Sequence, residues 1–216
     1  MDGFIEFLKE LVNPESIIRY GGLYLLLFVV FAETGLFFGF FLPGDSLIFT
    51  AGLLCATGEL DFPFLTVVIL VIGASVAGNM VGYAFGKKMG PFLFRRKSSF
   101  LFRHDHIIAA KDFYQKHGGK AIVICRFLPV VRTFAPIVAG IVLLDYKRFL
   151  FYNVVGAVAW IGSFASIGFF LGHYFPGIKE YLGYIIVFLI ITTAIPVLIR
   201  ILKSRNESTS EKTLKQ

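Results

Sequence analysis

The amino-acid sequence predicts an all-α polytopic membrane protein, built as an inverted repeat with two re-entrant hairpins of broken helices, about three to four full transmembrane spans and interfacial amphipathic helices. Composition is the first reason, because 56% of the 216 residues are hydrophobic and only 16% are charged, against roughly 25% charged in soluble domains. Several apolar runs also reach about 20 residues, enough to cross ~30 Å of hydrocarbon. A sequence pattern that is repeated in the two halves of the chain is the third reason. An ordinary soluble enzyme and a disordered protein are excluded.

Residues 1–13 are predicted to form an amphipathic helix in the membrane interface. Apolar side chains fall on one helical face and charged side chains on the other, and the segment is too short to span. Its start lacks the cationic region and cleavage site of a secretory signal, so we expect it to stay in the mature protein. Asn13-Pro14 then predicts the start of a new helix, because asparagine caps free N–H groups and proline tolerates the first helical position.

A single membrane domain is predicted over residues 14–200, with a first repeat over about residues 20–90. The apolar run that opens this repeat is interrupted by Glu33 and by the Pro43-Gly44 turn, and one straight helix does not tolerate such a turn. We therefore expect a hairpin that is broken at Pro43 and Gly44. Residues 20–57 form either one long hairpin or a span followed by a shorter hairpin. An uninterrupted span over residues 64–85 follows an acidic loop.

The segment 87–120 is predicted to be a cytoplasmic loop. It carries nine basic residues against two acids, and membrane proteins retain Lys and Arg on the cytoplasmic side. Within it, residues 105–117 predict a second interfacial helix. The tail 201–216 is polar and basic, and is predicted to be disordered and cytoplasmic. We expect a multi-pass protein of the cell (cytoplasmic) membrane, with the side of the N-terminus left open.

The second repeat is predicted over about residues 118–177, and a last span follows over residues 181–199. The apolar block 121–144 is flanked by basic residues at both ends, so it begins and ends on the same face of the membrane. It should therefore be a re-entrant hairpin, with breaks at Pro129 and Pro136. The span over residues 149–171 then runs outward.

The two halves share glycine and proline positions at a constant offset of 86 residues, which chance would not supply three times in order. The spans that follow the two hairpins run in opposite directions, so the repeat is inverted. Substrate sites of inverted-repeat transporters form between paired broken helices near the membrane midplane. The matching pairs are Pro43 and Pro129, Gly82 and Gly168, and Gly86 and Gly172.

Four ionisable side chains interrupt the apolar sequence: Glu33, Asp45, Arg126 and Arg132. Each costs roughly 2.5–3.5 kcal/mol at a helix centre if it faces lipid, so each must be paired, hydrated or near an interface. The two acids fall in the first hairpin and the two arginines in the second. Two interpretations stay open, namely structural ion pairs that lock the hairpins together and a functional site.

The functional interpretation rests on the chemistry of the side chains. The planar guanidinium of arginine binds phosphate and stays charged at physiological pH, so Arg126 and Arg132 are the candidate phosphate ligands. Removal from water disfavours the charged form of a carboxylate, so Glu33 and Asp45 can exchange protons or balance the arginines. This hypothesis assigns no catalytic residue and no metal.

Four motifs lie at residues 33–35, 42–52, 78–87 and 126–140. Together they resemble the DedA family, the bacterial branch of the SNARE-associated Golgi or VTT domain proteins. The resemblance covers roughly residues 15–200 and implies lipid transport driven by the proton-motive force, with undecaprenyl phosphate returned across the membrane in several members and phospholipids flipped by others.

The resemblance maps the essential acids of the family onto Glu33 and Asp45, and its essential arginines onto Arg126 and Arg132. The family commonly has an acid where this chain has Asn79, which leaves Asn79 and nearby Tyr83 as secondary candidates.

The sequence therefore predicts a proton-coupled lipid transporter, most directly of undecaprenyl phosphate, whose partners are a polyprenyl phosphate or phospholipid, protons and the bilayer. A phosphatidylethanolamine flippase or scramblase, a membrane-bound lipid-phosphate enzyme and a structural protein remain as alternatives. An enzyme is disfavoured because the one His outside the central loop, His173, lies at a span end. No cofactor or nucleic acid is expected, and a homo-oligomer stays open. Trp160 is interpreted as a helix-packing residue.

Overall fold

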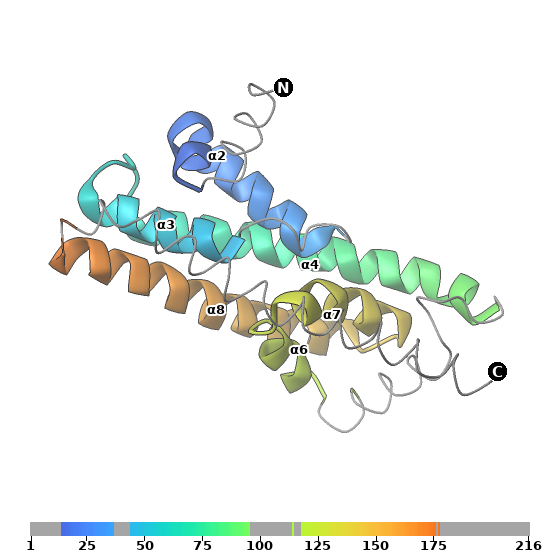
Figure 1. Cartoon of the computed structure of the whole chain (residues 1–216). Coiled ribbons are helices and arrows are strands. Elements are labelled where there is room, and N and C mark those ends of the chain that lie inside the picture. The colour runs from blue at the N-terminus through green and yellow to red at the C-terminus, as the bar shows by residue number, and fades with distance from the viewer. Residues whose placement is uncertain (1–13, 37–43, 96–113, 115–117, 176, 178–216) are drawn as a thin grey trace, which may run out of the picture. The chain divides into compact units, whose positions relative to one another are not determined.

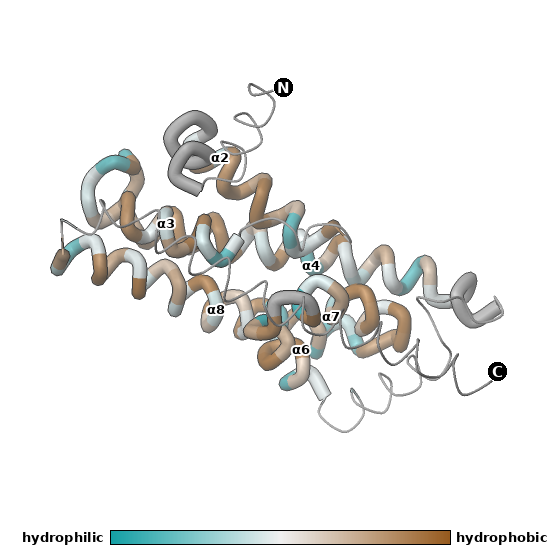
Figure 2. The backbone as a smooth tube through the Cα atoms, in the orientation of Figure 1, coloured by the Kyte–Doolittle hydropathy of each residue, from teal (hydrophilic) through white to brown (hydrophobic). Residues whose placement is uncertain are grey.

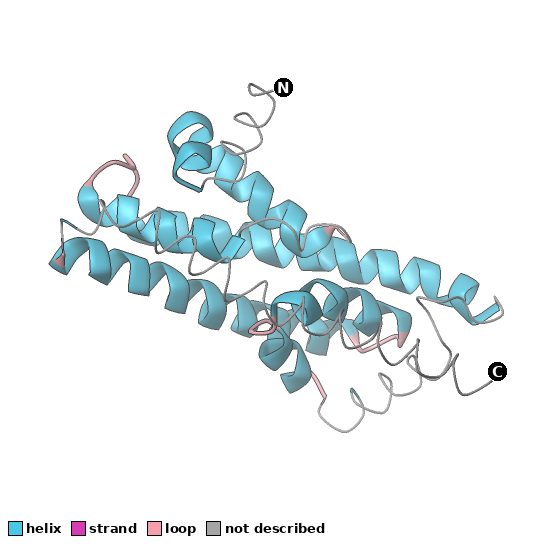
Figure 3. Ribbon diagram, viewed as in Figure 1, coloured by secondary structure: helices cyan, strands magenta, loops and turns pink. Residues whose placement is uncertain are grey.

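A computed structural model describes residues 14–36, 44–95, 114, 118–175 and 177, and within these ranges the regular structure is helical, with no strand (Figures 1 and 3). The chain divides into two units, Met1–Pro176 and Gly177–Gln216, and the six α-helices that the structure describes belong to the first. They are α2 (Pro14–Gly35), α3 (Gly44–Thr57), α4 (Phe64–Arg95), α6 (Lys120–Cys125), α7 (Pro129–Ile141) and α8 (Tyr146–Tyr174).

Two of these helices are long and apolar enough to cross a membrane, over Phe64–Gly90 in α4 and Tyr146–Tyr174 in α8. In their most apolar stretches only 28% and 33% of the residues are buried inside the protein, which distinguishes them from the core helices of a soluble domain. Three shorter apolar helices accompany them, and Figure 2 shows hydrophobic residues along α2, α3 and α7.

Local sequence signals place the helix ends. Helix α2 begins at Pro14, as the Asn13-Pro14 pair predicts, and Gly22 interrupts it with a φ of 57° that favours glycine. The Asp45 and Asp145 carboxyls stand at the starts of α3 and α8, and Asp145 caps α8 by accepting from the Arg148 backbone N–H at 2.9 Å. Helix α4 extends ten residues beyond the predicted span end, because Lys87 and Lys88 are exposed and do not interrupt it.

The short helix of each half packs along the long helix of the other half. Helix α3 of the first half packs along α8 of the second, and α7 of the second half packs along α4 of the first. The long helices α4 and α8 run in opposite directions, since Phe64 contacts Phe169 at one end and Tyr83 stacks on Phe149 at the other. The ring centroids of each pair are 4.5 Å apart. Opposed long helices are what the inverted repeat predicts.

Glycines let these paired helices approach closely, which gives the repeated positions a physical meaning. In the α3–α8 contact, a Cβ at Gly168 would overlap the carbonyl oxygen of Phe49, and one at Gly52 would overlap that of Ala165. In the α4–α7 contact, a Cβ at Gly86 would overlap the carbonyl oxygen of Ile137. Close approach of helix backbones at glycines therefore occurs in both of these helix pairs.

The predicted hairpin breaks have three outcomes. Pro43 lies outside the described residues, and Gly44 is the first residue of α3. Pro129 begins α7 after a bend at 126–128, so this break is present. The break expected at Pro136 is wrong, because α7 continues through it to Ile141. A proline removes one backbone N–H donor, and the packing of α7 along α4, with Gly82 beside the proline ring, keeps the helix continuous.

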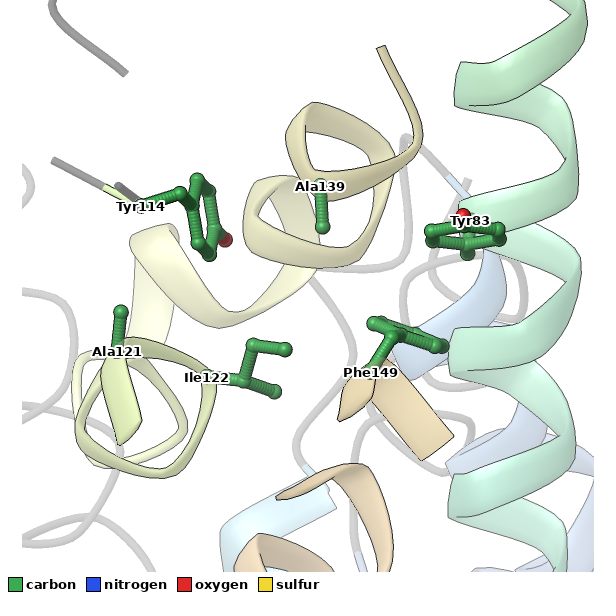
Figure 4. Close-up of a cluster of buried hydrophobic side chains, with 6 residues drawn as sticks. All are labelled: Tyr83, Tyr114, Ala121, Ile122, Ala139 and Phe149. Carbon is green, nitrogen blue, oxygen red and sulfur yellow. The ribbon is translucent and has the colours of Figure 1, made fainter. Parts of the chain in front are cut away.

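A hydrophobic cluster joins α4, α6, α7 and α8 (Figure 4). Tyr83 belongs to it and donates its hydroxyl to the Leu144 carbonyl at 2.6 Å, while the Tyr114 hydroxyl donates to the Ala135 carbonyl at 2.9 Å. The cluster consists of Tyr83, Tyr114, Ala121, Ile122, Ala139 and Phe149.

Several predicted elements lie outside the described residues. These are the interfacial helix at 1–13, the helix at 105–117 except for Tyr114, the last span at 181–199 and the tail at 201–216. They stay predictions.

Gly168→Ala should destabilise the protein by about 1–3 kcal/mol, because the added methyl group must push α3 away from α8. Gly162→Ala in the same helix is the matched control, since a Cβ there meets nothing within 4 Å. Thermal unfolding of the purified full chain in detergent measures both. Equal stability of the two variants would contradict the close crossing.

Candidate functional site

Three of the four charged side chains form one buried cluster. Arg132 Nη1 donates to Asp45 Oδ1 at 2.6 Å, and Arg132 Nη2 donates to Glu33 Oε1. The exposed fractions are 0% for Glu33, 7% for Asp45 and 8% for Arg132. The cluster therefore ties α2, α3 and α7 together through one guanidinium.

Local structure brings these side chains together. Glu33 lies in the last turn of α2, and its carboxyl group reaches the start of α3, where a Cβ at Gly44 would overlap Glu33 Oε2. Asp45 lies in the first turn of α3, where the helix dipole favours a negative charge. Gly44 and Asp45 are thus needed at this point, because the glycine makes room for one acid and the next residue supplies the other.

Trp160 completes the cluster from α8. Its indole N–H donates to Asp45 Oδ1 at 2.9 Å, and its ring lies 4.7 Å from Arg132 Cζ and 5.9 Å from Arg126 Cζ. A ring face attracts a guanidinium, and more strongly away from water. The prediction that Trp160 only packs helices is therefore incomplete, because it also contacts both arginines and one acid.

Arg126 has a different environment from Arg132. It is 3% exposed, and it donates from Nη1 to Ser75 Oγ at 2.9 Å and from Nη2 to Asn153 Oδ1 at 2.5 Å. Within the described part of the chain, both ion pairs of the site belong to Arg132, and the partners of Arg126 are neutral. Arg126 is thus a buried cation held by uncharged groups.

Asn79 links the two long helices beside Arg126. Its amide nitrogen donates to Asn153 Oδ1 at 2.8 Å, while the Asn153 nitrogen donates to the Val76 carbonyl at 3.2 Å. In its other amide orientation, the Asn79 oxygen accepts from Arg126 Nη2 at 2.8 Å. Asn79 therefore lies in the site, whereas Tyr83, its companion as a secondary candidate, lies in the hydrophobic cluster.

Sequence reasoning missed Ser75 and Asn153. The signal for both was present, because each is a polar side chain inside an apolar span, where such groups find polar partners. Gly156, which close helix packing predicts to be small, also borders the site. Its role is steric, since a Cβ there would lie 2.8 Å from Arg126 Cδ.

With all four side chains ionised, the site has no net charge, but its positive and negative charges are not evenly distributed. Arg132 with two carboxylates sums to −1, and Arg126 contributes +1. Among the four charged side chains of the site, three buried polar atoms have no hydrogen-bond partner in the described part of the chain: Glu33 Oε2, Arg126 Nε and Arg132 Nε. Each keeps capacity for a further bond, to a proton at the carboxyl oxygen or to an acceptor at the arginines.

Comparison with known proteins places these residues in a family. The model of the VTT domain matches residues 42–170. Protein DedA of Escherichia coli K12 is 39% identical over 198 residues, covering 92% of this chain and 89% of that protein. The inner membrane protein YqjA of the same strain is 38% identical over 166 residues, covering 76% and 73%. An uncharacterized membrane protein of Mycobacterium leprae is 36% identical over 188 residues, covering 87% and 83%. No solved structure matches the chain.

Arg132→Gln should destabilise the protein by roughly 3–5 kcal/mol, because it leaves two buried carboxylates without their counter-charge. Adding Glu33→Gln and Asp45→Asn should recover part of this loss by removing both uncompensated charges. Thermal unfolding of the single and triple variants measures the difference. A triple variant no more stable than the single one would contradict the electrostatic account of the cluster.

Proposed function

The chain belongs to the VTT domain family that includes Protein DedA, and we propose that it is a proton-coupled transporter that carries a lipid phosphate, undecaprenyl phosphate, across the cytoplasmic membrane. Its membrane nature is shared with its relatives, among them an inner membrane protein. The observation that carries the proposal is Arg126, a buried guanidinium whose described partners are all neutral. Neutral partners can be exchanged for phosphate oxygens at little electrostatic cost, and the charge-assisted bonds that replace them are stronger.

Arg132 would be the second phosphate ligand, controlled by the two acids. While Glu33 and Asp45 are ionised, they hold the guanidinium in two ion pairs. Protonation of either carboxyl removes its charge and weakens its hold on Arg132. Proton uptake would thus release an arginine to the substrate, and proton loss would reclaim it.

Charge balance supports a phosphate monoester as substrate. A monoester carries about −1.5 to −2 at neutral pH, which two arginines neutralise when both carboxyls are protonated. A phosphodiester lipid carries a single negative charge on its phosphate and would leave this site positively charged. Buried excess charge is costly, so the arrangement favours a polyprenyl phosphate over phosphatidylethanolamine.

The inverted repeat supplies a route for alternating access. We infer that α2 with α3, and α6 with α7, form two re-entrant hairpins whose helices converge on the site from opposite halves of the repeat. Rocking of one half against the other would open the site to either side in turn. The basic segment 87–120, which begins in the last part of α4, and the C-terminus would lie in the cytoplasm.

Reconstitution into liposomes tests the proposal. The wild-type chain should move undecaprenyl phosphate between leaflets faster when a pH gradient is imposed. Glu33→Gln and Asp45→Asn should lose the dependence on the gradient, and Arg126→Lys and Arg132→Lys should lose most of the transport, because lysine lacks the planar fork. The readout is the amount of lipid phosphate accessible at the outer leaflet.

Unchanged translocation in all four variants, each folded as judged by thermal unfolding, would overturn these roles. Phosphatidylethanolamine in place of undecaprenyl phosphate is the substrate control. Phosphate release from polyprenyl pyrophosphate is measured in parallel, and release by the purified chain would favour a lipid-phosphate enzyme instead.

Asn153→Asp should lower transport roughly ten-fold or more while the fold is kept. The new carboxylate would replace an amide oxygen that already accepts from Arg126, and an ion pair there would compete with the substrate phosphate. Asn153→Ser removes the amide without adding a charge and is the matched control. Equal transport by the aspartate variant and wild type would contradict a role for Arg126 as a cation whose described partners are neutral.

A further inference from the structure

A second basic region lies away from the buried charges, where α6 and α8 begin. A cleft of about 460 Å³ opens there between the Gly118-Gly119 turn with Lys120 on one side and the first two turns of α8 on the other. Its lining consists of Gly118, Gly119, Lys120, Lys147, Arg148, Phe151 and Tyr152. None of these residues belongs to the candidate site formed by Glu33, Asp45, Arg126 and Arg132.

Among the residues that the structure describes, the cleft is lined by three cations and no acid. Lys120, Lys147 and Arg148 are exposed, and within the described ranges none of them forms an ion pair. The nearest acid in sequence, Asp145, caps α8 by accepting from a backbone N–H. Three cations around one cleft attract an anion, and phosphate is the group that lysine and arginine bind together.

The two glycines shape the cleft. Gly118 adopts a φ of 57°, which favours glycine. A Cβ at Gly119 would overlap the ring of Tyr152, so the ring packs directly against the backbone of the turn. This contact fixes Lys120, which follows the turn, opposite Lys147 and Arg148.

An apolar surface continues from the cleft along α8, which identifies the kind of anion. Phe151 is 62% exposed and lies one turn after Lys147, and exposed valines follow on the same face of the helix at Val154, Val155 and Val158. A cationic group followed by an apolar stripe on a membrane span matches a ligand with a phosphate head and a hydrocarbon tail. A free phosphate ion would use only the first part of this surface.

We propose that this cleft binds the phosphate headgroup of an anionic membrane phospholipid, with the acyl chains lying along Phe151 and the valines of α8. The site is separate from the proposed transport site and does not depend on the transport proposal. Its cations lie at the end of a helix that can span a membrane, which is the depth of lipid headgroups.

Native mass spectrometry of the full chain in detergent tests this, with phosphatidylglycerol and phosphatidylcholine added in equal amounts. The wild type should retain phosphatidylglycerol preferentially. Lys147→Gln/Arg148→Gln should weaken that retention by roughly five-fold for each charge removed. Lys120→Gln, on the opposite wall of the cleft, should have the effect of one charge and serves if the double variant does not fold.

The matched control is Lys87→Gln/Lys88→Gln, which removes two exposed charges near the C-terminal end of α4, outside the cleft. An equal loss in this control would overturn the proposal in favour of general surface charge. Phe151→Ser should lower lipid retention without changing the charge. If inorganic phosphate alone displaces phosphatidylglycerol at comparable concentration, the site is one for free phosphate and the lipid proposal is wrong.

Discussion

The pairing of one guanidinium with two carboxylates is the interaction on which the described structure depends. Arg132 joins Glu33 of α2 and Asp45 of α3 to α7, and Trp160 of α8 covers the same group. Removing three ions from water is expensive, and the pairing repays that cost only while the geometry of all three is kept. A cluster of this kind adds little net stability, but it strongly disfavours every arrangement that separates its members. It therefore specifies how the two halves meet.

Close helix packing supplies the remaining constraint. Each short helix lies on the long helix of the other half, and glycines at the crossings bring backbones into contact. In a membrane, apolar burial gives little drive for helices to associate, so tight van der Waals packing matters more. The α3–α8 and α4–α7 crossings are therefore built in the same way. The chemistry of the site is not symmetric, since the acids belong to one half and the arginines to the other.

The sequence predicted the helical class, the two long helices, the opposed halves and the meeting of acids with arginine, because apolar length, basic loops and repeated glycines each have one structural meaning. The sequence could not predict that the two arginines have different partners. Both Arg126 and Arg132 lie a few residues from a proline in apolar sequence. Only the packing shows that Arg132 faces the carboxylates and that Arg126 faces Ser75 and Asn153. Pro136 misled for a related reason, since proline breaks an isolated helix but is tolerated where a neighbouring helix supports the turn.

The position of Trp160 has an optical consequence. It is the single tryptophan of the chain, it is 1% exposed, and it lies against both arginines while donating to Asp45. Indole emission responds to nearby charge, because the excited state has a larger dipole than the ground state. The intrinsic fluorescence of the unlabelled protein therefore originates inside the charged cluster itself. Any rearrangement of its ions changes the colour or intensity of that emission, so the molecule carries a built-in reporter of its own site.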